Sequence, residues 1–197
     1  TNRAHRGLEL FAQFGPTISA AEFYAIKHDK FYSPATYYVA YLEKIKAQQF
    51  ADGLLQQAQH VIAQWDLGTD VTNTSAALGT CVLLAAERQK DRDTHDAEQV
   101  AELLGECAET LLAAKGRLDP PWGEVNRHVR GGVNVPVGGG PDILRAIYGR
   151  GLKEEGFLTN VAGDGLYYLV AWDANGQLSV EGVHQFGSAT LDELSPH

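Results

Sequence analysis

The first 118 residues carry apolar side chains at the spacing of amphipathic helices, whose buried face recurs every three or four positions. This periodicity, together with the polar or glycine-containing stretches that interrupt it, predicts a series of helical segments. The predicted segments span residues 3–13, 19–29, 33–45, 52–65, 76–87 and 97–115. The segment at residues 76–87 is apolar on almost every side, so we predict that it is the most buried helix.

Several of these segments begin or end at residues suited to capping. Ser19 and Glu22 have the spacing of a capping box, in which each side chain satisfies a backbone N–H group of the other residue. Ser33 precedes a proline and is predicted to begin the third segment, and Asp52 is predicted to cap the fourth. Gly116 follows the last segment, where a left-handed backbone conformation would end the helix.

The pattern changes at residues 119–121, where the sequence Asp-Pro-Pro disfavours helix and favours an extended path. Beyond this point strand-type alternation and glycine-rich turns replace the helical period. The sequence therefore predicts an α+β protein, with a helical region at residues 1–118 and a β-rich region at residues 119–197.

The β-rich region contains several predicted strands. Residues 133–137 predict a short edge strand, because a proline within it cannot donate to a ladder, and residues 157–161 predict another strand. Residues 166–172 are apolar at both parities, which predicts an interior strand covered on both faces. The sequence Asp-Ala-Asn-Gly at residues 173–176 predicts a hairpin turn into a returning strand at residues 178–183.

A run of three glycines and a proline at residues 138–141 leads into residues 142–148, which are predicted to form a short helix. A glycine turn that enters a helix can bind an anion. The Gly-Lys-Ser/Thr ending of a phosphate-binding loop is absent, however. We therefore interpret the glycines as a tight turn that positions the helix.

Composition and charge limit the classes of partner. The chain has 197 residues, 44% hydrophobic and 21% charged, and a formal net charge of −9. Such a chain has no basic stripe with which to bind phosphates, and it would be repelled by anionic lipid. The longest nearly apolar run, at residues 76–86, is too short to span a bilayer. Neither a nucleic-acid partner nor a membrane partner is expected.

The residues most often used in metal sites, disulfides and catalysis show no specific arrangement. Cys81 and Cys107 each lie in an apolar helical segment, which favours two buried free thiols, with a disulfide as the alternative. The seven histidines lack metal-ligand spacing, so no metal and no cofactor is expected. His184 and Ser188 could suggest a base and a nucleophile, but no nucleophile elbow surrounds the serine, and we interpret them as structural.

A set of motifs follows one another in a fixed order along the chain. They are T-N-R-A-H-R-G-L-E-L-F at residues 1–11, K-H-D-K-F-Y-S-P at 27–34, W-G-E-V at 122–125, G-G-G-P at 138–141, A-G-D-G at 162–165, H-Q-F-G-S-A at 184–189 and S-P-H at 195–197. With this order of motifs, the chain resembles the C-terminal part of the β-subunit of penicillin-acylase-type N-terminal-nucleophile hydrolases. That family includes penicillin amidase, acyl-homoserine-lactone acylase and aculeacin-type acylases.

The resemblance implies a fold and a setting. The β-rich region would contribute hairpin strands to the αββα sandwich of the family. The catalytic serine is the first residue of the family's β-subunit and would lie upstream, outside this chain. The partners would be the α-subunit, the N-terminal part of the β-subunit and a small N-acyl amide substrate. A periplasmic or secreted location follows from the same resemblance.

The resemblance places no catalytic residue in this segment and points to Arg3 as a residue that supports the active site. An arginine at the start of this helix helps to organise the active site in family members, and its planar guanidinium can hold a carboxylate or carbonyl groups. Thr1 could in principle act as an N-terminal nucleophile. It leads directly into a predicted helix, however, whereas a mature amino terminus of this family leads into a strand, so we do not expect this role.

The resemblance implies that the parent protein hydrolyses linear amides between a hydrophobic acyl group and an amine. Penicillins, acyl-homoserine lactones and lipopeptides all fall within this substrate class. The segment alone is expected to be inactive, since the nucleophile lies elsewhere. The alternative function is a non-catalytic scaffold or partner-binding module.

Overall fold

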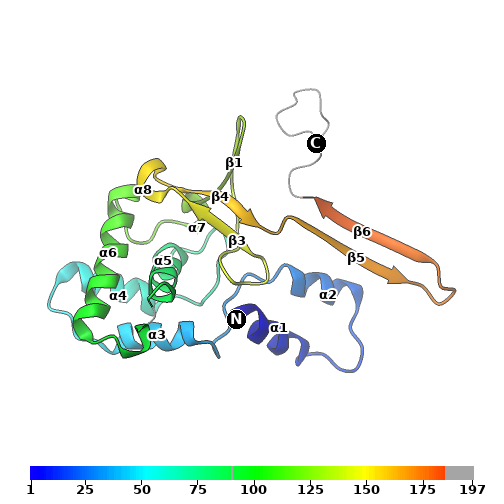
Figure 1. Cartoon of the computed structure of the whole chain (residues 1–197), viewed down its shortest axis with the longest axis horizontal. Coiled ribbons are helices and arrows are strands. Elements are labelled where there is room, and N and C mark those ends of the chain that lie inside the picture. The colour runs from blue at the N-terminus through cyan, green and yellow to red at the C-terminus, as the bar shows by residue number, and fades with distance from the viewer. Residues whose placement is uncertain (90, 185–197) are drawn as a thin grey trace.

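The computed structural model describes residues 1–89 and 91–184. Ser188 and the motifs at residues 195–197 and 185–189 lie outside the described residues. The chain is a mixed α and β protein in which helices dominate the first half and strands the second. Figure 1 shows the helices from α3 (Tyr37–Ala47) to α6 (Ala97–Lys115) grouped together, with the strands β1 (Asn126–Arg130), β3 (Ile147–Arg150) and β4 (Leu158–Gly163) beside them. A long hairpin of β5 (Leu166–Trp172) and β6 (Leu178–His184) extends away over α2 (Ala20–Lys27).

The described helices are α1 (Asn2–Phe11), α2 (Ala20–Lys27), α3 (Tyr37–Ala47), α4 (Gly53–Ala63), α5 (Ala76–Glu87), the 3₁₀ helix η1 (Arg92–Thr94), α6 (Ala97–Lys115), α7 (Trp122–Val125) and α8 (Leu152–Glu155). Helices α1 to α6 correspond to the six predicted segments, whereas η1, α7 and α8 were not predicted. Most of the residues of α5 are buried, which confirms the prediction made for this segment.

The predicted caps are confirmed except at α3. Ser19 and Glu22 form the capping box of α2, Asp52 accepts hydrogen bonds from two backbone amides of α4, and Gly116 ends α6 with a φ of 70°. The prediction that Ser33 begins the third helix is wrong, because α3 begins after Thr36. The hydroxyl of Ser33 instead accepts a hydrogen bond from the amide of residue 35 and contacts Glu9, so residues 33–36 form a turn before the helix.

The main core lies among α3, α4, α5 and α6 and continues into α7. Its completely buried side chains include Leu42, Ile62, Leu78 and Leu104. Trp122, from beyond the Asp-Pro-Pro sequence, belongs to the same cluster. Residues on both sides of this sequence thus contribute to one core, and the division of the chain at residues 118 and 119 stays a prediction.

The strands form two sheets within the described residues. The first has the order β2-β1-β4-β3 and contains β1 (Asn126–Arg130), β2 (Val133–Pro136), β3 (Ile147–Arg150) and β4 (Leu158–Gly163). Strands β1 and β2 are antiparallel, β1 and β4 parallel, and β3 and β4 antiparallel. The predicted strands at residues 133–137 and 157–161 are confirmed, and the proline of the first lies on the edge strand as expected.

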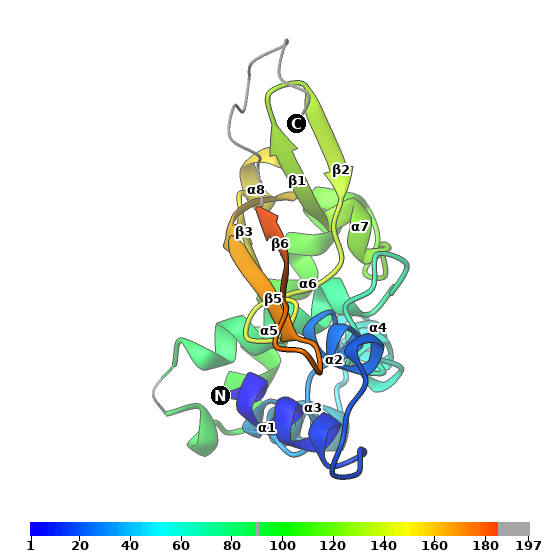
Figure 2. The same cartoon turned by 90° about the vertical axis from the view of Figure 1, so that its right-hand side faces the viewer.

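The second sheet is the hairpin of β5 (Leu166–Trp172) and β6 (Leu178–His184), which confirms the predicted turn at residues 173–176. The prediction that residues 166–172 form an interior strand is wrong for the described chain. Only β6 pairs with β5, and Tyr168 and Trp172 are 60% and 67% exposed. Figure 2, turned by 90° from Figure 1, shows the two strands of this hairpin side by side.

The helix predicted at residues 142–148 is absent, and this prediction is wrong. Asp142 follows a proline and has a φ of 52°, a left-handed conformation that does not continue into a helix. Turns occupy residues 141–145, and β3 begins at Ile147. The interpretation of the glycines as a tight turn that positions this helix is wrong too. Residues 137–139 form no turn, Gly140 makes an isolated bridge with Ala146, and the amides of Gly139 and Gly140 donate to the carbonyls of Thr69 and Arg145.

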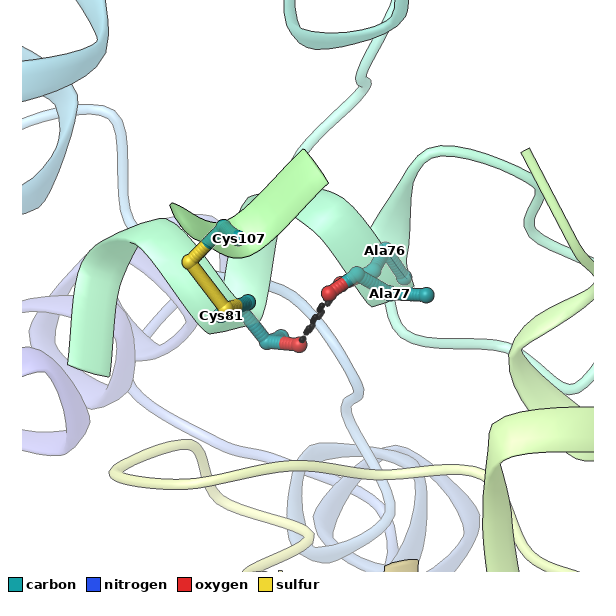
Figure 3. Close-up of a disulfide and its surroundings, with 5 residues drawn as sticks. Ala76, Ala77, Cys81 and Cys107 are labelled. Carbon is teal, nitrogen blue, oxygen red and sulfur yellow. Dashed lines mark hydrogen bonds between the residues drawn. A yellow bond between two sulfur atoms is a disulfide. The ribbon is translucent and has the colours of Figure 1, made fainter. Parts of the chain in front are cut away.

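Cys81 and Cys107 form a disulfide that joins α5 to α6 (Figure 3). The favoured prediction of two free thiols is therefore wrong, and the alternative is correct. The two helices pack against each other through leucines and alanines, and this packing brings both cysteines to the same point of contact. The spacing of apolar residues within each helix could not reveal which turns would meet.

Candidate functional site

Arg3, the one site residue that the sequence suggested, lies in the first turn of α1. Its Nε donates a hydrogen bond of 3.2 Å to Oδ1 of Asp142. The Arg3 side chain is 48% exposed, whereas that of Asp142 is 14% exposed. Among the described residues no other hydrogen bond to the guanidinium occurs, so one edge of the guanidinium is held and its two terminal nitrogens can contact a ligand.

Asp142 acts as a cap for α1 from a distant part of the chain. Its Oδ2 accepts a hydrogen bond of 2.7 Å from the backbone amide of Asn2, the first residue of the helix. Thr1, at the N-cap position, makes no side-chain capping bond. A carboxylate at this end of a helix is stabilised by the unpaired amides and by the helix dipole, so Asp142 replaces the missing local cap.

Asn2 joins three segments of the chain and is completely buried. Its Oδ1 accepts a hydrogen bond of 2.7 Å from the amide of Ser33, and its Nδ2 donates one of 2.9 Å to the carbonyl of Asp142. The hydroxyl of Tyr38, from α3, donates a bond of 3.2 Å to Oδ2 of Asp142. We call Asn2, Arg3, Ser33, Tyr38 and Asp142 the Asp142 network.

Burial keeps the phenols around this network protonated. The pKa of Tyr38 is raised far above its usual value, first by burial and then by a hydrogen bond with a neighbouring tyrosine and the charge of Asp142. Burial, with the same carboxylate, also raises the pKa of Tyr32, whose hydroxyl donates to the carbonyl of Pro141 at 2.8 Å. Both hydroxyls are therefore neutral donors, and neither is suited to act as a base near neutral pH.

Motifs that lie far apart in the sequence also contact one another outside this network. Arg6, from the first motif, makes two hydrogen bonds of 2.9 and 2.8 Å to Asp29 of the second. The indole of Trp122, from W-G-E-V, donates a bond of 2.8 Å to the carbonyl of Gly139 in the glycine segment. Asp164, from A-G-D-G, pairs with a lysine of the second motif at 2.7 Å.

The groups of the Asp142 network bind and orient rather than react. They are the paired carboxylate of Asp142, the side-chain amide of Asn2, the backbone amide of Ser33, the neutral phenol of Tyr38 and the half-exposed guanidinium of Arg3. Such a set can hold the guanidinium of Arg3 in one orientation toward a carboxylate or a carbonyl oxygen. The described residues contain no group of three or more histidine, cysteine or acidic side chains suited to a metal ion.

Sequence reasoning found Arg3 but missed the residues that position it. Asn2 and Asp142 are separated by 140 residues, and no local pattern links them. The local sequence Gly-Pro-Asp at residues 140–142 is the one feature that points to Asp142, because aspartate tolerates a left-handed conformation at a turn. The backbone of His184 ends β6, and the hydroxyl of Ser188 lies outside the described residues.

No protein-family model matches this chain, and no curated protein sequence matches it. The motifs and their geometry therefore carry the functional conclusion. Within the described residues, no helix is both long enough and apolar enough to cross a membrane.

Proposed function

We propose that this chain is a segment of the β-subunit of an amide hydrolase of the penicillin-acylase type. The observation that carries the proposal is the convergence of the motifs that the family resemblance rests on. Five motifs spread over residues 1–165 make direct contacts through Asn2, Arg6, Tyr32, Trp122 and Asp164.

In this proposal the chemistry begins on a serine at the amino terminus of the complete β-subunit. The serine attacks the amide carbonyl, an acyl-enzyme forms as the amine leaves, and water then releases the acid. Backbone and asparagine donors outside this chain hold the developing negative charge. The described residues contribute scaffold, and the Asp142 network holds Arg3 in the orientation that supports the active site.

The β5–β6 hairpin supports a partner of this kind. Its outer face carries Leu166, Tyr168, Val170 and Trp172 on β5 with Leu178 and Val180 on β6, all at least 47% exposed. An apolar sheet face of this extent normally packs against another layer. The remainder of the acylase would supply that layer, and the hairpin would become part of the αββα sandwich.

The variant Arg3→Leu in the complete enzyme tests the role of Arg3. We expect it to lower kcat for a linear N-acyl amide by at least about tenfold, the loss of one charge-assisted contact, with little change in the melting temperature. Arg117→Leu is the matched control, since Arg117 is also half exposed and paired with one aspartate, at 2.8 Å. Equal losses of turnover and stability in Arg3→Leu would remove the active-site role of Arg3.

The intact masses of all chains in the purified, active protein test the proposal as a whole. We expect a second chain, or a longer form of this one, that begins with serine and is labelled by a serine-directed acylating agent. A complete protein, with all of its chains present, that has no chain beginning with serine and hydrolyses no linear amide would contradict the hydrolase proposal. The exposed hairpin face would then favour the second candidate, a non-catalytic module that binds a partner protein.

A further inference from the structure

A hollow of about 400 Å³ lies between the two hairpins of the chain, away from the Asp142 network. One wall is the cross-strand pair His128 and Val135 of β1 and β2. The opposite wall is the cross-strand pair Tyr167 and Val183, on the inner face of the β5–β6 hairpin. Because Arg145 lies in its lining, we call this space the Arg145 hollow. Its volume falls in the range of small-molecule sites, about 300–1,000 Å³.

The charges at the Arg145 hollow leave an excess of one positive charge. Nη1 of Arg145 and Nζ of Lys27 both bind the same oxygen of Asp164, at 2.8 and 2.7 Å. One carboxylate thus serves two cations in a chain whose overall net charge is −9. Among the described residues, the guanidinium of Arg145 makes no further hydrogen bond, so its remaining N–H groups can bind an anion.

Aromatic rings form a second feature of the hollow. The rings of Tyr24 and His28 lie 4.4 Å apart, and Nδ1 of His28 is 2.9 Å from the carbonyl of Tyr24. The other ring nitrogen of His28 lies 3.0 Å from the hydroxyl of Tyr167. Both ring nitrogens of His28 therefore have hydrogen-bond partners, and these bonds hold the His28 and Tyr167 rings in place. The charged group left to bind a ligand is the guanidinium of Arg145.

The rest of the lining is apolar. Val135, Val137, Ile147 and Val183 surround the polar groups with branched side chains. Arg145, His28 and Val137 also border an adjoining hollow of about 350 Å³, so the cation lies at the junction of the two spaces. A ligand that fills this space would need one anionic end and an apolar body.

We propose that the Arg145 hollow is a binding site for a small monocarboxylate with an aromatic or branched apolar body. The carboxylate binds the guanidinium of Arg145, and the body lies between the valines and the Tyr24 and Tyr167 rings. Lys27, Arg145 and Asp164 together carry one excess positive charge, which a monoanion would balance. A cationic ligand would instead be repelled by the positive charges of Lys27 and Arg145. This site is independent of the amide hydrolase proposal, because it is formed entirely by residues of this chain.

The test measures binding of 3-phenylpropionate to the whole 197-residue chain by calorimetry and by ¹⁵N NMR. We expect saturable binding with shifts at the amides of Val137, Arg145 and Tyr167. The neutral 3-phenylpropionamide should bind at least about tenfold more weakly, because it lacks the charge-assisted bonds. Equal affinity for the acid and the amide, or shifts confined to other parts of the chain, would overturn the proposal.

Two variants and one control separate a true site from loss of folding. Arg145→Met should weaken binding of the acid by at least about tenfold and reduce its preference over the amide. Val135→Trp should fill the hollow and abolish binding while leaving the Asp164 ion pairs in place. Arg117→Met, at a different hollow, should bind as the unmodified chain does. Unchanged binding in both Arg145→Met and Val135→Trp would show that the acid binds elsewhere.

Discussion

At the scale of single residues, Asp142 connects α1 and α3 to the segment before β3. It follows the glycine segment in a left-handed conformation, and its carboxylate caps α1, orients Arg3 and accepts a hydrogen bond from Tyr38. These three carboxylate contacts use its negative charge, because the donors are an amide at a helix start, a guanidinium and a phenol. The residue is therefore a good point at which to test the network without changing its shape.

The variant Asp142→Asn keeps the size of the side chain and tolerates the left-handed conformation, but it removes the charge. We expect the free energy of unfolding to fall by about 1–3 kcal/mol, since hydrogen bonds to charged groups contribute most. Urea denaturation followed by circular dichroism measures this change. Asp93→Asn is the control, because the Asp93 side chain is 85% exposed, and it should have almost no effect. Equal effects of the two variants would contradict the capping role.

At the scale of elements, the contact between α5 and its neighbours determines how tightly the helical half packs. A side chain at Gly79 of α5 would place its Cβ 2.3 Å from the ring of Trp65, whose indole donates to the carbonyl of Gly68 at 2.8 Å. The glycine is therefore required by the close approach of the tryptophan. In α6, a Cβ at Gly105 would meet its nearest atom at 3.6 Å, an ordinary contact.

These two glycines form a matched pair of predictions. Gly79→Ala should destabilise the protein by about 1–3 kcal/mol, because overpacking against the indole outweighs the better helix propensity of alanine. Gly105→Ala should stabilise it by about 0.5–1 kcal/mol, because only the propensity changes. Chemical denaturation gives both values. A stabilising Gly79→Ala would show that Trp65 can move away at little cost.

The disulfide between α5 and α6 adds a covalent constraint to the same contact. It closes a segment with a sequence separation of 26, so the double variant Cys81→Ala/Cys107→Ala should lower the free energy of unfolding by about 3 kcal/mol. Thermal unfolding with and without a reductant measures the effect. The reductant should destabilise the unmodified chain and leave the double variant unchanged. Equal sensitivity of both proteins to the reductant would contradict a stabilising disulfide.

At the scale of the whole molecule, the β5–β6 hairpin exposes many large apolar side chains. Tyr167 on its inner face contacts α2, where its hydroxyl lies near His28 and its ring lies 4.8 Å from Nζ of Lys27. The outer face meets no other described element. A surface of this kind favours association, either with the proposed remainder of the acylase or with another copy of the chain.

Replacing a cross-strand pair on the outer face tests this surface. Val170→Lys with Val180→Glu places opposite charges across the hairpin, so the strands stay paired while the face becomes polar. We expect the isolated chain to bind less of a hydrophobic dye and to self-associate less in sedimentation experiments. The control is Ala171→Lys with Ser179→Glu, the neighbouring cross-strand pair on the inner face. Equal dye binding by both double variants would contradict an exposed outer face.

The sequence by itself determined features that depend on neighbouring residues. The helices of the first half, the capping box at Ser19, the cap at Asp52, the left-handed end at Gly116 and the hairpin turn at residues 173–176 all involve groups within a few positions of one another. Their physical cause is local hydrogen bonding and backbone preference, which a short stretch of sequence contains completely.

Only the tertiary structure decided the features that join distant residues. Asp142 caps α1 across 140 positions, Cys81 meets Cys107, and the strand at residues 166–172 lies exposed although its composition is that of an interior strand. The partner in each case is fixed by how helices and strands pack, and packing depends on the whole chain rather than on any local pattern. The same reason explains why Arg3 could be identified in the sequence while the residues that hold it could not.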